Sequence, residues 1–595
     1  MQASSASRSA DRHLHTPLLI VGGGTGGVAA ALAAARDGQA CVVTEPTAWV
    51  GGQLTSQAVP PDENQWIEGD AGFASATASY LDFRRRVRRL TKDRYYLTAE
   101  AEADPRLNPG RGWVSHLCCE PALAHEVLRG LLQPHLDAGL VTLLLHHEPV
   151  SAETTDRRVG SVTLRDLRDG SRLTVTADHV IDATECGDLL PLTGTAYAVG
   201  AEHRDVHGEL HGRTDRDNFP DPALDHDPTD QQAISWCFAL EHHPGEDHTI
   251  PKPAGYERWA AYRPDLDDPW PGPLFSWTVC GEHNRPRFLP MIPWPDEPPA
   301  GEGELWRYRR IVDRSLHRDT PQHPAPPDVS LVNWVQMDYF RRPTLDVSPS
   351  QQRAAFDEAR QQSLCFLYWL QTAAPRHAAP SQAVSSVDPS EIQTADATTG
   401  DSAADGPRRG YPGLKLHGRA LGTQDGFAMA PYIREARRLV ARTIVTEAHV
   451  GTQQRREAGV DAVAHPHFAG IPAHRFPDSV GIGHYRLDLH PTAAGRNSIY
   501  VDAAPFQIPL GSLIPVETEN LLAGGKNLGV THITNGCYRL HPVEWNIGEA
   551  AGALAAWCLR HETTPAQVHT DRDGELSRFQ DHLRQRGVTL EWPFG

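Results

Sequence analysis

The chain has 595 residues, enough for two to four folding units with a large hydrophobic core. Its 56 basic and 75 acidic residues give a net charge of −19, which argues against a nucleic acid or an anionic membrane as partner and favours a small molecule. Nine cysteines at irregular positions form no disulfide pattern, and no stretch approaches the roughly 20 apolar residues that span a bilayer, so we expect a cytoplasmic protein.

The first predicted unit is a strand, a glycine-rich turn, a helix and a second strand. Residues 1–15 lack an apolar segment and are predicted to be a flexible leader. The apolar run 18–21 predicts a buried strand, the alanine-rich stretch 28–36 predicts a helix, and residues 41–45 predict a second strand. This order is typical of a parallel βαβ unit.

The turn before this helix carries the glycine pattern of a dinucleotide site. Gly22, Gly24 and Gly27 occupy the positions of G-x-G-x-x-G, where glycine permits a tight turn, close approach of a diphosphate and close helix packing. Glu45, which ends the second strand, is placed to accept both hydroxyls of a ribose. Glycine-rich turns also occur for structural reasons, but the four elements together favour a dinucleotide.

A second glycine-containing turn follows Glu45. Gly51, Gly52 and Gln53 suit a chain that passes close to a flat ring, because glycine has no Cβ to keep the ring away. This turn favours FAD over NAD, with an ordinary β-turn as the alternative.

Several short strands are predicted before the middle of the chain. They cover residues 141–145, 159–164, 173–175 and 180–181, with a hairpin turn at Asp169-Gly170. The last strand runs into the segment 182–188, Asp-Ala-Thr-Glu-Cys-Gly-Asp.

The region of about 200–415 differs in composition and is rich in tryptophan, proline, histidine and aspartate. We expect an inserted substrate domain here, with a buried helix at 363–372. Residues 376–409 contain almost no large apolar side chain and are predicted to be a mobile surface loop.

Three other patterns have a structural and a functional interpretation. The histidine- and glutamate-rich stretch 241–248 lacks H-E-x-x-H spacing, so chance proximity among 31 histidines is favoured and no metal is predicted. The arginine run 84–89 favours a solvated helix face over an anion site. Cys118-Cys119 favours two small residues before a helix near Pro121 over a redox pair.

The C-terminal part supplies two more candidate cofactor elements. Residues 519–527 predict a buried strand broken by glycines, and residues 546–556 predict a helix with a small, close-packed first turn. The first N–H groups of such a helix can point at the pyrimidine edge of a flavin, although a core helix shows the same small residues.

Three residues between these elements are candidates for the chemistry. His532 is the first choice for a base or a hydrogen bond to the substrate. The planar guanidinium of Arg539 could clamp a carboxylate or an oxyanion, and His541 lies in the same polar stretch. A structural hydrogen bond or a surface position is the alternative for each of them; Asp488 and His490 are weaker candidates.

These motifs together resemble the FAD-dependent oxidoreductase family of the glutathione-reductase superfamily, which is related to the succinate dehydrogenase flavoproteins. The resemblance implies an α/β fold, in which a Rossmann-like FAD-binding domain is built from N- and C-terminal segments and an α+β substrate domain is inserted. It also implies that the backbone near Val150 meets the adenine. Other members tend to carry Ala-Gly-Arg where this chain has Gly524-Gly525-Lys526, which leaves the substrate open. The matching stretches are 21–27, 50–55, 181–188, 333–339, 432–438, 507–509, 520–526 and 548–552, with His532 and Arg539.

The expected cofactor is FAD, and the expected organisation divides the chain into six segments. The predicted cofactor contacts are Gly22, Gly24, Gly26, Gly27, Glu45, Gly51, Gly52, Gln53, Val150, Gly525, Asn527, Gly548, Glu549 and Ala550. The segments are the leader 1–15, a first FAD-binding segment 16–200, the inserted substrate domain 201–415, a return segment 416–510, a second FAD-binding segment 511–562 and a C-terminal extension 563–595.

The predicted function is an FAD-dependent oxidoreductase, a dehydrogenase or oxidase that takes a hydride from a small polar metabolite onto flavin N5. The alternatives are an NAD(P)H-dependent flavin monooxygenase and a non-catalytic FAD-binding protein. A second G-x-G-x-x-G unit and a C-x-x-C pair are both missing from the sequence, which disfavours a pyridine-nucleotide disulfide reductase. The electron acceptor, covalent attachment of the flavin and the oligomeric state stay open.

Overall fold

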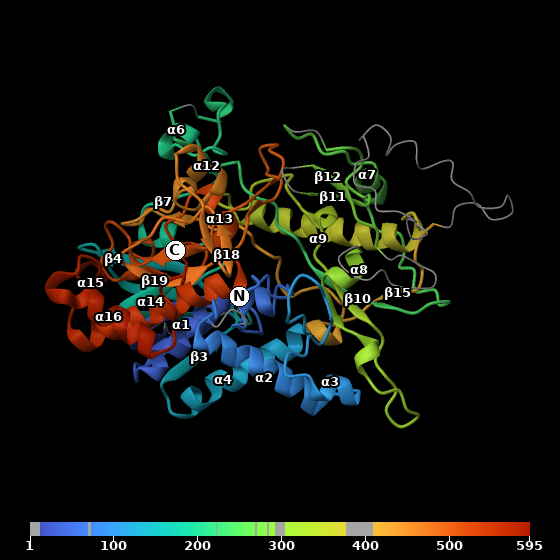
Figure 1. The fold of residues 1–595 in the computed structure, drawn as a ribbon, viewed down its shortest axis with the longest axis horizontal. Helices are drawn as coiled ribbons and strands as arrows, with labels where there is room; N and C mark the ends of the chain where they lie inside the picture. Colours follow the sequence, from blue (N-terminus) through green and yellow to red (C-terminus); the bar gives the residue numbers. More distant parts are fainter. Residues whose placement is uncertain are drawn as a thin grey trace, which may run out of the picture.

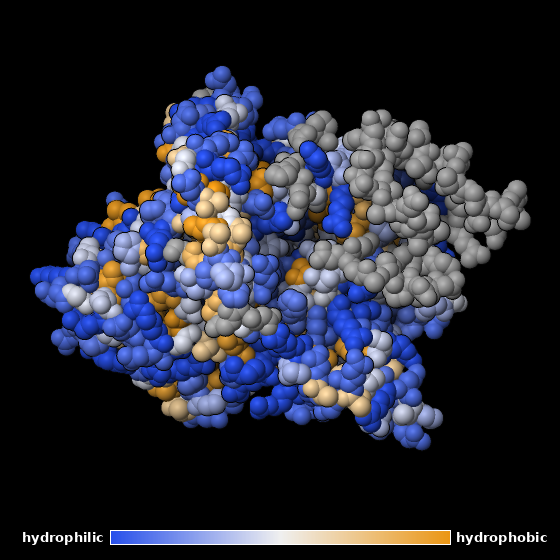
Figure 2. Space-filling model, viewed as in Figure 1, coloured by the Kyte–Doolittle hydropathy of each residue, from blue (hydrophilic) through white to orange (hydrophobic). Residues whose placement is uncertain are grey.

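The computed structural model describes residues 12–69, 73–221, 223–267, 270–281, 285–291, 304–376 and 409–594. Most of the predicted leader and of the predicted mobile loop lies outside these residues. Figure 1 shows two regions side by side, one around α1 and α14 and one around α9 and β10. Within the described residues, no helix is long and apolar enough to cross a membrane. The face drawn in Figure 2 is mostly hydrophilic, in keeping with the net charge of −19.

The first region is built on a seven-stranded sheet whose core is parallel. The strand order is β3-β2-β1-β6-β5-β4, and β23 pairs with the last residues of β6. Strands β3, β2, β1, β6 and β23 run parallel, whereas β4 and β5 form an antiparallel meander with the first half of β6. The strands are β1 (Arg12–Val21), β2 (Cys41–Glu45), β3 (Val141–Leu145), β4 (His147–Thr155), β5 (Arg158–Asp166), β6 (Arg172–Asp182) and β23 (Leu521–Ala523).

Two segments more than 500 positions apart in the sequence join in this region. Helix α1 (Thr25–Arg36) packs against α14 (His541–His561), and β23 joins the sheet next to β6. A Cβ on Gly548 would lie 2.0 Å from the carbonyl oxygen of Gly26, and one on Gly552 would lie 2.2 Å from that of Ala30. The backbones therefore touch because both helices carry small residues at the contact. The expectation that N- and C-terminal segments build one Rossmann-like domain is consistent with this sheet, to which both segments contribute parallel strands.

The second region contains a four-stranded antiparallel sheet and the long helix α9. The sheet has the order β13-β14-β10-β15, and α9 (Pro349–Thr372) packs beside it with Phe366 and Trp369 in an aromatic core. The helix begins with a capping box between Ser348 and Gln351. The buried helix predicted at 363–372 is confirmed, but it is the second half of a longer helix. The strands are β10 (Phe238–His242), β13 (Arg310–Val312), β14 (Val329–Val332) and β15 (Leu414–Leu416).

The remaining regular elements are short and connect or cover these two regions. The helices are α2 (Ala78–Arg94), α3 (Ala99–Ala103), α4 (Pro121–Asp137), α5 (Leu189–Thr193), α6 (Arg204–His207), α7 (Tyr256–Ala260), α8 (Leu305–Tyr308), α11 (Glu447–Val450), α12 (Thr452–Glu457), α13 (His532–Tyr538), α15 (Pro565–His569) and α16 (Glu575–Gln585). The strands are β7 (Tyr197–Ala198), β8 (Ala201–Glu202), β9 (His226–Asp227), β11 (Thr278–Cys280), β12 (Pro286–Phe288), β16 (Arg438–Leu439), β17 (Val463–His465), β18 (Phe468–Gly470), β19 (Ser479–Gly483), β20 (Leu487–Leu489), β21 (Ile499–Val501) and β22 (Phe506–Pro509).

The structure moves several predicted boundaries. Strand β1 already begins at Arg12, because Arg12–Thr16 pair with β6, so the strand replaces the end of the predicted leader. The strands predicted at 173–175 and 180–181 are one continuous strand, β6, since β1 pairs with its full length. The predicted strand at 519–527 shortens to β23. The Asp169-Gly170 turn between β5 and β6 is confirmed, with Gly170 at a φ of 75°.

The arginine run is not a fully solvated helix face. It lies on α2, where Arg85 and Arg86 are exposed and pair with Asp82. Arg84 and Arg88, on the opposite side of the helix, are buried and pair with Glu63 and Glu68. Their burial could not be predicted because the two glutamates come from a loop upstream of the helix.

Candidate active site

The glycine turn after β1 leaves no room for side chains. A Cβ on Gly22 would lie 2.2 Å from the carbonyl oxygen of Ala183, one on Gly26 would lie 1.9 Å from that of Gly524, and one on Gly27 would lie 1.9 Å from that of Gly22. Gly22 has a φ of 103°, which favours glycine. Helix α1 starts directly after this turn, and within the described residues no side chain caps it. Its first N–H groups are therefore available to an anion.

The second glycine turn faces the first. The Gly51 N–H donates to the Gly23 carbonyl oxygen over 2.7 Å, and the Thr25 hydroxyl donates to the Gly51 carbonyl oxygen over 2.9 Å. Added Cβ atoms on Gly24 and Gly52 would lie 2.6 Å and 2.4 Å from the same atom, Oε1 of Glu185. The Glu185 carboxylate therefore lies between the two turns, in the space that the glycines leave. The helix N-terminus beside it fits the diphosphate of a dinucleotide, which would have to displace this carboxylate.

Glu45 lies buried at the end of β2, as the dinucleotide pattern requires. Its Oε1 accepts hydrogen bonds from the backbone N–H of Thr47 over 2.8 Å and from the Thr47 hydroxyl over 2.6 Å. Burial raises the pKa of Glu45 to about 7, against the lowering effect of the Thr47 hydrogen bonds. Oε2 faces the Gly23 backbone and fits a ribose hydroxyl. Val150 is half-buried in β4, and its contact with adenine stays a prediction.

A buried lysine joins the two terminal segments. Lys526 follows β23, and its Nζ pairs with Glu185 and lies 3.8 Å from Oε1 of Glu544. Burial alone would lower the pKa of Lys526, but Glu185 and Glu544 raise it, so the ammonium stays charged. Gln53 Nε2 donates to Glu544, while Gln53 Oε1 has no hydrogen-bond partner in the described part of the chain. The unpaired amide oxygen and the fixed positive charge fit the polar edge of a flavin.

The predicted C-terminal contacts divide into two groups. Gly525 and Asn527 lie beside Lys526, with the Asn527 side chain donating to the Asp182 carbonyl oxygen over 3.0 Å. Helix α14 begins at His541, not at Asn546, because Pro542 opens its first turn. Gly548, Glu549 and Ala550 therefore lie inside the helix, which corrects the expectation that their N–H groups form its open end. In the structure, Gly548 packs on α1, Glu549 accepts a hydrogen bond from Ser79 over 2.5 Å, and Ala550 is buried.

A cluster of buried charges lies next to the second glycine turn. We call Asp62, Arg309, Tyr432, Asp488 and Arg539 the charge cluster. Arg539 Nη1 donates to the Tyr432 hydroxyl over 2.8 Å, and Nη2 donates to the backbone carbonyl oxygen of Asp488 over 2.9 Å. Arg309 Nη2 lies 3.3 Å from Oδ1 of Asp62.

The charge cluster adjoins the second glycine turn and reaches the protein surface. Gln53 Nε2 donates to the Arg539 carbonyl oxygen over 3.1 Å, so the residue after the two glycines touches the cluster. Asp62, Arg309 and Arg539 are buried, whereas the Asp488 side chain is 20% exposed. The cluster therefore has a route to solvent at Asp488.

The two carboxyl groups of the charge cluster differ in proton affinity. Burial raises the pKa of Asp62 despite the lowering effect of Arg309 and Arg539. Burial also acts to raise the pKa of Asp488, but His490 and Arg539 outweigh it and hold this pKa at about 2. Asp488 therefore stays ionised near neutral pH, and Asp62 is the better proton acceptor.

His532 lies in a different buried network. Its Nδ1 is 2.9 Å from Oε1 of Glu435, and its backbone N–H donates to Glu202 over 2.9 Å. Both glutamates pair with Arg438. We call these four residues, with Glu209, the His532 network. His532 opens α13 and Arg539 follows its last residue, so a rise of about 10 Å separates the two, and the structure does not bring them together.

His541 lies against the charge cluster as a buried, neutral ring. Its Nδ1 accepts a hydrogen bond from the Asp62 N–H over 3.0 Å, and its Nε2 donates to the Val59 carbonyl oxygen over 3.2 Å. Burial and the nearby Arg309 keep its pKa well below the ordinary value. His541 therefore orders the chain between Val59 and Asp62.

Several site residues were not predicted as such from the sequence. Asp62 and Arg309 come from loops without a motif, and Tyr432 was quoted only as part of a matching stretch. Glu185 and Lys526 also lay in matching stretches, and their opposite charges were the available signal; in the structure Lys526 is buried and Glu185 is 23% exposed. The paired cysteines give no redox centre in the structure: Cys118 and Cys119 are both buried free thiols, and burial raises the pKa of Cys118 to about 12.

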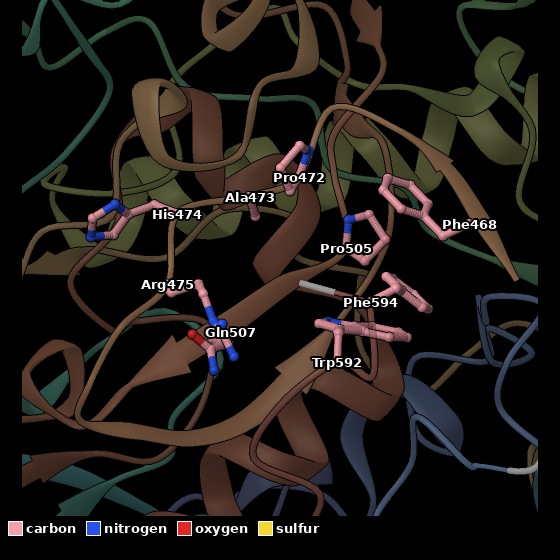
Figure 3. Close-up of a pocket in the computed structure, with 9 residues that line it drawn as sticks. All are labelled: Phe468, Pro472, Ala473, His474, Arg475, Pro505, Gln507, Trp592 and Phe594. Carbon is pink, nitrogen blue, oxygen red and sulfur yellow. The ribbon is translucent and has the colours of Figure 1, made fainter. Parts of the chain in front are cut away.

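The pocket in Figure 3 lies apart from these residues. It is lined by the aromatic rings of Phe468, Trp592 and Phe594 and by prolines of neighbouring loops. It includes none of the predicted site residues, so we assign it no part in the cofactor site.

Comparisons with known proteins give a family and weak structural likenesses. None of the curated proteins compared with the chain is similar enough to match. A flavin-dependent monooxygenase, PieE, in complex with FAD and substrate is 20% identical, over 38% of this chain and 35% of that one, with a TM-score of 0.21. L-proline dehydrogenase from P. horikoshii is 13% identical, over 33% of this chain and 26% of that one, with a TM-score of 0.16.

Structural similarity this weak establishes no common activity. In both comparisons the matched part is well under two thirds of the compared protein. The family model described as FAD dependent oxidoreductase, in contrast, matches residues 17–583. That range includes both glycine turns, Lys526 and the charge cluster, and the cofactor of the family is FAD. The chain therefore belongs to the FAD dependent oxidoreductase family.

Proposed function

We propose that this chain oxidises a small polar metabolite bound at the charge cluster, with transfer of a hydride to the flavin. The main support for the proposal is a contact of Gln53, which lies in the turn expected at the flavin ring. Its side-chain amide donates hydrogen bonds to the Arg539 carbonyl oxygen and to Glu544. Bound FAD supplies a two-electron acceptor, and a second molecule must reoxidise it. The hydride and one proton leave the substrate together, so a proton acceptor must also lie at this place.

The residues of the charge cluster have separable roles in this proposal. The guanidinium groups of Arg309 and Arg539 hold oxygen atoms of the substrate, and the Tyr432 hydroxyl orients the Arg539 fork. Asp62 accepts the proton, since its pKa is raised; its Oδ1 lies 3.3 Å from Nη2 of Arg309 and accepts no hydrogen bond within the described residues. His541 positions Asp62 through the backbone.

The charges also favour one class of substrate. Arg309 and Arg539 carry two positive charges, and Asp62 and Asp488 carry two negative charges when ionised. A balanced cluster suits a neutral or zwitterionic metabolite better than a polyanion, because an added multiple charge would be buried without a partner. The second region forms the other wall through Arg309, which directly precedes β13, and this supports a role in substrate selection. A cytoplasmic location belongs to the same proposal and is supported by eight described cysteines that are all free thiols.

Anaerobic stopped-flow measurements test the proposal. The FAD-loaded protein is mixed with amino acids, hydroxy acids, sugars and amines, and bleaching of the flavin absorbance is followed. We expect one class to bleach the flavin, and Arg539→Lys to slow bleaching about 100-fold with FAD content unchanged, since lysine lacks the planar fork.

Arg213→Lys is the matched control, because Arg213 is an equally buried arginine held by Asp215 and Asp230. It should bleach at the wild-type rate. Rapid bleaching by NADPH alone would favour a monooxygenase instead. Bleaching by none of the compounds would favour a non-catalytic flavoprotein.

A further inference from the structure

A second group of chemically active side chains lies at the far end of β10. His243, Glu246 and His248 each place one ligand atom within 4.8 Å of the other two. The rings of His243 and His248 have their centroids 5.4 Å apart. The sequence favoured chance proximity here, but the loop turns back on itself at Gly245, which has a φ of 86°.

The backbone of this loop is fixed by neighbouring segments. The His243 N–H donates to the Gly413 carbonyl oxygen over 2.9 Å, and the His248 N–H donates to that of Pro412 over 2.8 Å. The Gln371 side chain donates to the His248 carbonyl oxygen over 2.8 Å. A Cβ on Gly413 would lie 2.2 Å from the carbonyl oxygen of His243, so the contact requires glycine. The three side chains therefore project from an ordered frame.

A half-buried carboxylate, that of Glu241, orients one of the rings. Glu241 Oε2 lies 2.6 Å from His243 Nε2, and Glu241 Oε1 lies 2.8 Å from His417 Nδ1. Because a carboxylate only accepts hydrogen bonds, His243 Nε2 carries the hydrogen and Nδ1 of the neutral ring presents its lone pair. That Nδ1 lies 3.7 Å from Oε1 of Glu246, beyond hydrogen-bond distance. Metal-binding histidines in proteins are held by carboxylates in the same way.

We propose that His243 Nδ1, the Glu246 carboxylate and His248 Nε2 bind one zinc ion, with water as the fourth ligand. Two imidazole nitrogens and one carboxylate oxygen are ligands that zinc prefers to calcium or magnesium. Tetrahedral ligands at roughly 2.1 Å from zinc lie about 3.4 Å apart. At present His243 Nδ1 lies 3.7 Å from Glu246 Oε1, and His248 Nε2 lies 2.7 Å from the other oxygen, Oε2. The exposed Glu246 side chain must therefore turn so that one of its oxygens binds zinc together with both nitrogens.

Zinc binding requires one rearrangement of protons. His248 Nε2 now shares a hydrogen with Glu246, and this hydrogen must move to Nδ1 of the same ring or leave to solvent before Nε2 can bind zinc. The side chains of His243 and His248 are 25% and 28% exposed, so zinc can enter from solvent. Through Glu241 and His417 the ion would tie the end of β10 to the segment that follows β15.

Zinc titration of the FAD-loaded, full-length protein tests the proposal after treatment with a chelator. We expect one equivalent of zinc by calorimetry and by metal analysis, a higher melting temperature with zinc, and neither effect with calcium or magnesium. The double variant His243→Ala/His248→Ala should lose the equivalent and the shift in melting temperature. Glu241→Gln should weaken zinc binding about 10-fold, because it removes the carboxylate that holds His243.

A second histidine pair provides the control. His465 and His467 have ring centroids 5.5 Å apart on the β17–β18 turn, and His465→Ala/His467→Ala should keep the zinc equivalent. If the double variant at His243 and His248 loses FAD, Glu246→Ala replaces it in the test. Because the Glu246 side chain is exposed, its removal should leave the fold intact and still abolish zinc binding. Three results would each overturn the proposal. The wild-type protein could bind no zinc, the His243/His248 variant could titrate like the wild type, or only the control variant could lose zinc.

Discussion

Two buried networks of charge lie at the two ends of α13, and they differ in their access to solvent. In the His532 network, Arg438 is fully buried between Glu202 and Glu435, and His532 itself is 1% exposed. The charge cluster contains similar groups but opens to the surface at Asp488 and touches Gln53 in the second glycine turn. A route to solvent and a neighbouring glycine turn therefore distinguish the charge cluster from the His532 network, and the proposed function rests on this difference.

The largest expected effect is a loss of stability when the His532 network is broken. It should leave the flavin chemistry unchanged, which would separate this network from the charge cluster. Arg438→Met leaves Glu202 and Glu435 buried without their cation, and we expect a loss of about 3–5 kcal/mol in the free energy of unfolding. Urea denaturation measures it. The flavin reduction rate per bound FAD should not change. Arg158→Met, at an exposed arginine 3.7 Å from Glu519, should change stability by less than about 0.5 kcal/mol.

Removal of the proposed proton acceptor should act on the rate instead. We expect Asp62→Asn to slow substrate-dependent flavin bleaching at least about 100-fold, because an amide cannot accept the proton, while FAD content stays the same. Asp230→Asn is the control at an equally buried aspartate held by Arg213 and Arg496. Equal slowing in both variants would mean that Asp62 acts only through folding.

Glu209 of the His532 network should make the free energy of unfolding depend on pH. Burial, with the neighbouring Glu202 charge, raises the pKa of Glu209 to about 8, against 4.5 for an exposed glutamate. The folded state then binds more protons than the unfolded state between about pH 4.5 and 8, so this group makes stability fall as the pH rises through that window. In Glu209→Gln, denaturation curves across the window should lose this slope. An unchanged slope would place its origin elsewhere.

The smallest expected effect concerns the solvent-exposed edge of the charge cluster. Asp488→Asn removes a charged partner of Arg539 but keeps the backbone carbonyl bond. We expect a rise of about 5-fold in KM with little change in kcat, because one modest hydrogen bond is weakened. Steady-state kinetics on the substrate found by the bleaching screen measures it. A fall in kcat with unchanged KM would contradict an effect of Asp488 on substrate binding through Arg539.

Local sequence patterns predicted the cofactor half well. Strand, glycine turn, helix and second strand occupy a continuous segment that ends at Glu45, and glycine permits tight turns and close backbone contacts that other residues do not. The same reasoning failed for the start of α14, because Pro542 opens a helix whose first turn shows no small-residue pattern. The role predicted for His532 stays a prediction; the structure places its ring in the His532 network, with Nε2 unpaired among the described residues.

The sequence by itself determined the βαβ unit and its glycine turn, because these depend on residues close together in the chain. It also indicated the family, because the matching motifs recur along nearly the whole chain. Only the tertiary structure decided which charges meet, since Asp62, Arg309, Asp488 and Arg539 come from four distant segments. It also decided that His243, Glu246 and His248 converge, because Gly245 and the contacts with Gln371, Pro412 and Gly413 fold that loop. Side-chain charge is a property of each residue, but pairing and burial are properties of the fold.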